Sequence, residues 1–358
     1  MSNQVFFTPG PSQKFYSLEQ HLKNALREDI ISISHRSADF KRIFEETTEN
    51  LKLLLNIPSE YQLFFTSSAT EIWERIVQNL VYSRSHHLVN GSFSNRFYET
   101  ALAYQLQPSI AKSEFGQPLA LTIPADTELI AITQNETSIG YNFPQEEIRE
   151  IAESKPADAL IAVDAVSCTP SVPLDYSLID TTYFSVQKCF GLPAGLGVWI
   201  VNERCIEKSE KVRESGKVTG FHHSIAQLKK YADKFQTPET PNVLGIYLLN
   251  KVVQDLLYRG ARQIQNDCTY KSAIIYQAMT KLDWVAPFIS ENKYRSKTVC
   301  VGQLVGRSSA DIIDGMKKHM MILGTGYGQF KDDHIRIANF PTHSKEQMEL
   351  FVDLLETI

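Results

Sequence analysis

The chain has 358 residues, which is long for one hydrophobic core and predicts a large domain with a smaller one beside it. Hydrophobic residues make up 43% of the chain and charged residues 22%, as in ordinary soluble globular proteins, and the net charge of −5 argues against a nucleic-acid-binding protein. No apolar stretch approaches the roughly 20 residues needed to cross a bilayer, and the N-terminus lacks the features of a signal peptide.

The five cysteines are scattered along the chain and show no C-x-x-C spacing. Their odd number and wide separation favour reduced, buried thiols over a disulfide framework or a zinc site. We therefore expect a cytoplasmic protein without a metal centre.

The first two thirds of the chain alternate between short apolar runs and helical patterns after an extended, proline-containing start at residues 6–12. The patterns predict helices at residues 17–27, 40–55, 70–82, 95–106 and 145–153. They predict strands at residues 62–65, 87–90, 129–133, 160–164, 183–186 and 197–201. This alternation predicts a mostly parallel sheet flanked by helices, with ligands at the carboxyl ends of its strands.

From about residue 242 the pattern changes. It predicts helices at 243–259, 267–282, 311–319 and 344–355, with strands at 298–305, 320–323 and 334–338. We therefore expect two domains: an N-terminal segment with the large domain over residues 1–242, and a linking helix with a small α+β domain over residues 243–358.

Two charged residues stand where predicted strands end. Lys188 follows the strand at 183–186 and precedes a glycine-rich stretch, and Asp164 ends the strand at 160–164. A surface lysine and a helix-capping aspartate are the alternatives. This layout is typical of a pyridoxal 5′-phosphate (PLP) site, where the lysine forms a Schiff base and the aspartate pairs with the pyridine nitrogen.

Three other strand ends carry candidate cofactor contacts. Ser68, Ala69 and Thr70 open a predicted helix, so their backbone N–H groups could bind a phosphate, unless they form only an ordinary cap. Phe93 could stack on an aromatic ring, or it could be a core residue. Thr137 could donate to the phenolic side of the cofactor, or it could belong to a polar turn.

Two arginines are candidates for binding acidic groups of a substrate. Arg36 lies in the sequence Ser-His-Arg-Ser at residues 34–37, and Arg336 interrupts an apolar strand. Arginine suits bidentate binding of carboxylate or phosphate, although a surface salt bridge is the alternative for each.

These motifs, taken together, resemble the class V aminotransferases of PLP fold type I, and most closely their phosphoserine aminotransferase branch. The resemblance covers nearly the whole chain in family order. It rests on Thr8-Pro9-Gly10-Pro11, Ser34-His35-Arg36-Ser37, Ser68-Ala69-Thr70, Asn135-Glu136-Thr137, Asp164, Gln187-Lys188, Thr237-Pro238 and Arg336. It implies a large domain with a mostly parallel seven-stranded sheet and a smaller α+β domain.

The resemblance also implies a homodimer with each active site at the interface. Gln187 would contact the cofactor phosphate, and Gln236 and Thr237 would reach that phosphate from the partner subunit. Arg336 would hold the substrate carboxylate, while His35 and Arg36 would meet a substrate phosphate. The implied reaction is ping-pong transamination between O-phospho-L-serine and 2-oxoglutarate in serine biosynthesis, through the Schiff base on Lys188.

The chain departs from the branch at three places. The turn at residues 68–70 lacks an arginine that phosphoserine enzymes usually carry there, Phe93 replaces a tryptophan, and Gln236 replaces an asparagine. An alanine or serine aminotransferase using glyoxylate or pyruvate therefore stays open. A PLP lyase, which would need a reactive cysteine, and a non-catalytic protein with the same fold are further alternatives.

Overall fold

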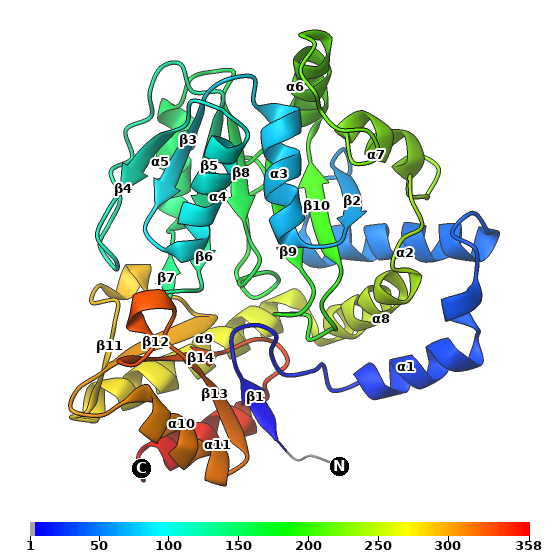
Figure 1. Cartoon of the computed structure of the whole chain (residues 1–358). Helices are drawn as coiled ribbons and strands as arrows, with labels where there is room; N and C mark the ends of the chain where they lie inside the picture. Colours follow the sequence, from blue (N-terminus) through cyan, green and yellow to red (C-terminus); the bar gives the residue numbers. More distant parts are fainter. Residues whose placement is uncertain (1–3) are drawn as a thin grey trace.

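The computed structural model describes residues 4–358 and contains a seven-stranded sheet (Figure 1). In spatial order the strands are β2 (Gln62–Thr66), β10 (Gly197–Val201), β9 (Thr181–Ser185), β8 (Leu160–Asp164), β5 (Leu129–Thr133), β3 (Ser85–Val89) and β4 (Ser109–Lys112). All neighbouring pairs are parallel except those of β10, which is antiparallel to both β2 and β9. The predicted mostly parallel seven-stranded sheet is confirmed.

Helices surround this sheet. They are α1 (Leu18–Arg27), α2 (Ala38–Leu55), α3 (Ala69–Leu80), α4 (Ser92–Ala103), α5 (Gln145–Ser154), α6 (Glu203–Glu214), α7 (Ile225–Ala232) and α8 (Val243–Arg259). Figure 1 shows α3 and α4 in front of the sheet, while α2 packs against α8. The helices begin at polar caps, as in α3, where the Ser68 hydroxyl accepts from the N–H of Glu71.

A second sheet of five strands is built mainly from the C-terminal part. Its order is β1 (Val5–Phe7), β13 (Met321–Thr325), β14 (His334–Ala338), β12 (Val299–Leu304) and β11 (Val285–Pro287). It packs with α9 (Ala261–Lys281), α10 (Ser309–Lys318) and α11 (Lys345–Leu355) around a separate hydrophobic cluster. The predicted α+β character of this part is confirmed.

The N-terminal segment joins the two sheets. Strand β1 lies parallel to β13, with Phe7 opposite Leu323, so the first strand of the chain belongs to the C-terminal sheet. The chain then returns to the large sheet, where the N–H of Ser12 donates to the carbonyl of Gln187 at 3.2 Å. The pairing of β1 was not predicted from sequence. The domain boundary after residue 242 coincides with the start of α8 and stays a prediction.

Several elements were also missed by the sequence prediction. They are the helices α6 and α7, the strands β4 and β11, and the two-stranded ribbon of β6 (Asn135–Glu136) and β7 (Tyr141–Asn142). The missed strands have only two to four residues, which is too short to show a period. Within residues 4–358, no helix is long and apolar enough to cross a membrane.

Candidate active site

Lys188 lies in the turn that follows β9, beneath the N-terminal segment. Its side chain is buried, with 8% of the residue exposed, and its Nζ donates to the Thr137 hydroxyl at 3.1 Å. Burial lowers the pKa of Lys188, although the nearby carboxylate of Asp164 opposes this effect. A lysine in such surroundings is a better nucleophile and proton acceptor than a surface lysine.

Asp164 ends β8 and is buried beside β9. Its Oδ1 accepts from the N–H of Val166 at 2.9 Å. Burial raises the pKa of Asp164 from 3.8 to about 6, in spite of the Val166 hydrogen bond and the Lys188 charge. In the described part of the chain no cationic side chain forms an ion pair with it, so this buried acid is suited to a cationic ligand atom.

Phe93 lies in the first turn of α4, with its ring centre 5.2 Å from Lys188 Nζ. Its position is fixed by Glu136, which is fully buried and accepts from the N–H groups of Phe93 and Ser94. The hydroxyl of Ser138 donates to the same carboxylate at 2.6 Å. Glu136 was not predicted from sequence as a positioning residue, although its place beside Thr137 after a strand could have indicated it.

Arg336 reaches the same region from β14 of the second sheet. Its Nε donates to the carbonyl of Thr325 at 2.7 Å, and its Nη1 donates to the carbonyl of Thr137 at 3.4 Å. Burial lowers the pKa of Arg336 to about 10, so the side chain stays cationic at neutral pH. The guanidinium carbon lies 5.2 Å from the centre of the Tyr327 ring, a contact that sequence could not reveal.

The start of α3 differs in one detail from the sequence expectation. The N–H of Ala69, expected to be free for a phosphate, donates to the Ser185 hydroxyl at 2.7 Å. Thr70 lies in the first turn, where helix N–H groups have no partner within the helix. Gln187 lies next to Lys188, and its backbone carbonyl accepts a hydrogen bond from the N–H of Ser12.

A second cluster contains the remaining predicted residues. Arg36 donates to the Gln236 side chain at 3.1 Å and to the carbonyl of Thr237 at 2.8 Å, and it also reaches the carbonyl of Pro238. His35 precedes it and is partly buried. Within residues 4–358 no hydrogen bond or ion pair joins this cluster to Lys188. These predicted residues therefore lie together, and in the described chain none of them bonds directly to Lys188.

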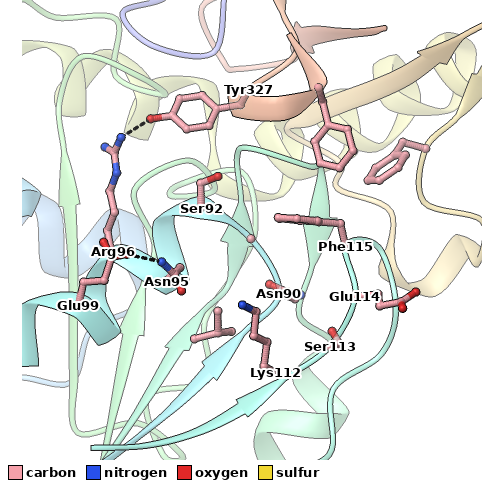
Figure 2. A pocket seen from close by; sticks show the side chains of 14 residues that line it. Asn90, Ser92, Asn95, Arg96, Glu99, Lys112, Ser113, Glu114, Phe115 and Tyr327 are labelled. Carbon is pink, nitrogen blue, oxygen red and sulfur yellow. Dashed lines mark hydrogen bonds between the residues drawn. The ribbon is translucent and has the colours of Figure 1, made fainter. Parts of the chain in front are cut away.

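A cavity of about 970 Å³ lies beside the site, between α4 and the second sheet (Figure 2). Lys188 does not line it, but the residues directly before Phe93 do. Its walls are Val89, Asn90, Gly91, Ser92, Asn95, Arg96, Glu99, Lys112, Ser113, Glu114, Phe115, Phe288, Tyr327 and Phe330.

Comparison with known proteins places the chain in a family. The family profile described as aminotransferase class V matches residues 5–326. A putative phosphoserine aminotransferase of Mycobacterium avium (strain 104) is 26% identical over 334 residues, which cover 92% of this chain and 88% of the relative.

Solved structures agree with this assignment. A phosphoserine aminotransferase from Cytophaga hutchinsonii is 43% identical, with a TM-score of 0.97 over 100% of this chain and 99% of the other. An aspartate aminotransferase from Thermus thermophilus shares the fold, with a TM-score of 0.87 at 20% identity over 99% of both chains. The buried lysine, the strand-end aspartate and the family match together lead to one conclusion: the chain belongs to the class V aminotransferase family and is a transferase.

Proposed function

We propose that the protein binds PLP and transfers the amino group of O-phospho-L-serine to 2-oxoglutarate in the cytoplasm, as a step of serine biosynthesis. The observation that carries the proposal is the buried amine of Lys188, with its lowered pKa, facing Phe93 and Thr137. The names of the relatives from Mycobacterium avium and Cytophaga hutchinsonii support the choice of donor.

The residues present suit PLP. Asp164 would pair with the pyridinium nitrogen, which explains a buried acid without a cationic partner. Phe93 would stack on the ring, and Thr137 would donate to its phenolic oxygen. The first turn of α3, from Ser68 to Thr70, and Gln187 would hold the phosphate.

When bound, PLP supplies an electron sink for the substrate carbanion. The chain's own residues do the rest. Arg336 holds the α-carboxylate, with its guanidinium fixed by the carbonyls of Thr325 and Thr137. The amine of Lys188 would accept the substrate Cα proton and return it during the transfer, because burial lowers its pKa and so favours its neutral form.

We propose a homodimer in which Gln236 and Thr237 reach the partner's cofactor phosphate. The support is that no hydrogen bond or ion pair joins their cluster to Lys188 in the described chain, together with the shared active sites that the resemblance implies. Because Arg36 ties this loop to the start of α2, we expect the loop to be held in one conformation at the interface.

An amino-donor panel tests the proposal. Purified protein is loaded with PLP, and the absorbance of the bound cofactor is followed with phosphoserine, serine, alanine and glutamate. We expect phosphoserine and glutamate to bleach the band, and Lys188→Ala to lose turnover by several orders of magnitude while keeping its fold. Wild-type turnover by Lys188→Ala would end the proposal.

The same panel separates the alternatives. Bleaching by alanine but not by phosphoserine would indicate an alanine–glyoxylate type of enzyme. A lyase is disfavoured because Cys300 is fully buried in β12 and burial raises the pKa of its thiol. Protein that stays colourless after incubation with PLP would indicate a non-catalytic role.

A further inference from the structure

Tyr327 lies against two guanidinium groups. The guanidinium carbon of Arg336 is 5.2 Å from the centre of its ring, and that of Arg96 is 5.6 Å away. Arg96 Nη2 also donates to the Tyr327 hydroxyl at 2.6 Å. The Tyr327 ring therefore contacts both guanidinium groups, and the distance between their two carbons is at most the sum of these two distances.

Arg96 carries a positive charge that no acid neutralises. Within residues 4–358, it forms no ion pair. Glu99, one turn further along α4, instead accepts from the side chain of Asn95 at 2.7 Å. Figure 2 shows Arg96 extending away from Glu99 toward Tyr327. Such an arginine is available for bidentate binding of an anion.

The cavity next to Arg96 supplies further donors. Asn90 is 4% exposed, and its Nδ2 is buried without a hydrogen-bond partner. Lys112, a second cation without an ion pair in the described chain, lines the same cavity. A buried amide donor that lacks a partner costs free energy unless a ligand or water accepts from it. Glu114 also lines the cavity, and Figure 2 shows it on the side away from Arg96.

We propose that Arg96 determines specificity by binding the distal anion of the substrate. An amino acid with a second acidic group, carboxylate or phosphate, would extend from Arg336 past Tyr327 to Arg96. This inference rests on the proposed aminotransferase function. Arg96 would supply a positive charge in place of the arginine that the turn at residues 68–70 lacks. Arg36 is less available for this role, because it donates hydrogen bonds to the loop at residues 236–238.

Binding of unreactive acids tests the role directly. Calorimetry on PLP-loaded protein compares glutarate, which has two carboxylates, with butyrate, which has one. We expect Arg96→Gln to weaken glutarate binding roughly tenfold or more and butyrate binding less than about twofold, because one charge-assisted hydrogen-bonded contact is lost. Arg96→Lys should recover part of the difference, since it restores the charge without the planar fork. Tyr327→Phe should fall between wild type and Arg96→Gln, because it removes only the hydroxyl that orients Arg96.

Kinetics then identify the anion. The ratio of kcat/KM for phosphoserine to that for alanine should fall roughly tenfold or more in Arg96→Gln, and the ratio for glutamate to alanine should show whether a carboxylate uses the same contact. Equal effects of Arg96→Gln on glutarate and butyrate, or a loss seen with Arg36→Gln instead, would overturn the inference. If no donor bleaches the cofactor but glutarate binding still depends on Arg96, the proposed function fails and the anion site stands.

Discussion

Gly10 lies against the aliphatic part of Lys188. A Cβ at this position would stand 2.9 Å from Lys188 Cε, and the φ of +151° is one that residues with side chains rarely adopt. We predict that Gly10→Ala pushes the lysine out of place and raises the dissociation constant of PLP roughly tenfold or more, as expected for an overpacked site. An absorbance titration of the apoprotein with PLP measures this constant.

Gly216→Ala is the matched control for Gly10→Ala. Gly216 also has a positive φ, +84°, but no heavy atom lies within 4 Å of the position that an alanine methyl group would occupy. It should lose about 1 kcal/mol of stability from backbone strain and bind PLP as the wild type does. If both variants bound PLP normally, Gly10 would not position Lys188.

Sequence could predict those site residues whose chemistry is unusual for their place in the chain. Lys188 and Asp164 each follow an apolar run, and Arg336 interrupts one, so each is a polar group that folding brings toward the interior. Tyr327 and Arg96 could not be predicted as site residues, because their proposed role depends on a hydrogen bond between segments 231 residues apart. The N–H of Ala69 donates to the Ser185 hydroxyl in this structure, so its predicted contact with a phosphate stays a prediction.

At the scale of elements, His223 connects α3 to the loop before α8. In the segment between α6 and α7, its Nδ1 pairs with Glu71 of α3 and its Nε2 lies 3.3 Å from Glu239. The carboxylates of Glu239 and Glu71 raise the pKa of His223 from 6.5 to about 9. Arg75, whose Nε lies 3.5 Å from Glu71, is another charge facing the group. The bridge therefore ties the expected phosphate-binding turn to the loop that contains Thr237.

This bridge predicts a pH dependence of stability. A histidine whose pKa is raised in the folded state stabilises the fold fully below its unfolded pKa of 6.5, and this stabilisation is lost as the pH rises through about 9. We predict that the free energy of unfolding falls by about 2 kcal/mol over this window, less than the roughly 3 kcal/mol of the full shift because solvent screens the partly exposed ion pairs, and that His223→Gln removes the fall. Urea unfolding at several pH values measures it. His222→Gln, at the exposed neighbouring position, is the control. An unchanged pH profile in His223→Gln would contradict the bridge.

Long elements could be predicted because their period repeats over several turns. The 17-residue helix α8 was predicted with its observed bounds, and Asn242 caps it while Gly260 ends it. Strand β1 could not be predicted, because three residues show no period and its partner β13 lies more than 300 residues further along the chain. The prediction of short strands thus failed where stability comes from distant pairing.

At the scale of the whole molecule, the two clusters of predicted residues lead to a test of the proposed dimer. Lys188 and the loop containing Thr237 belong to different clusters of one chain. We suppose that the loop of one subunit completes the active site of the other. A dimer with a defective lysine in one subunit and a defective loop in the other then keeps one of its two active sites intact.

We predict complementation between two impaired variants. Lys188→Ala carries one tag, the paired change Gln236→Ala with Thr237→Val carries another, and the hybrid is isolated through both tags after co-refolding. Each homodimer should be strongly impaired, whereas the hybrid should recover about half of the wild-type activity, because one site combines an intact lysine with an intact loop from its partner. If the loop served its own chain, both sites of the hybrid would be defective and no activity would return. Hybrids of Lys188→Ala with wild-type subunits provide the reference, because they too should hold one intact site under either arrangement.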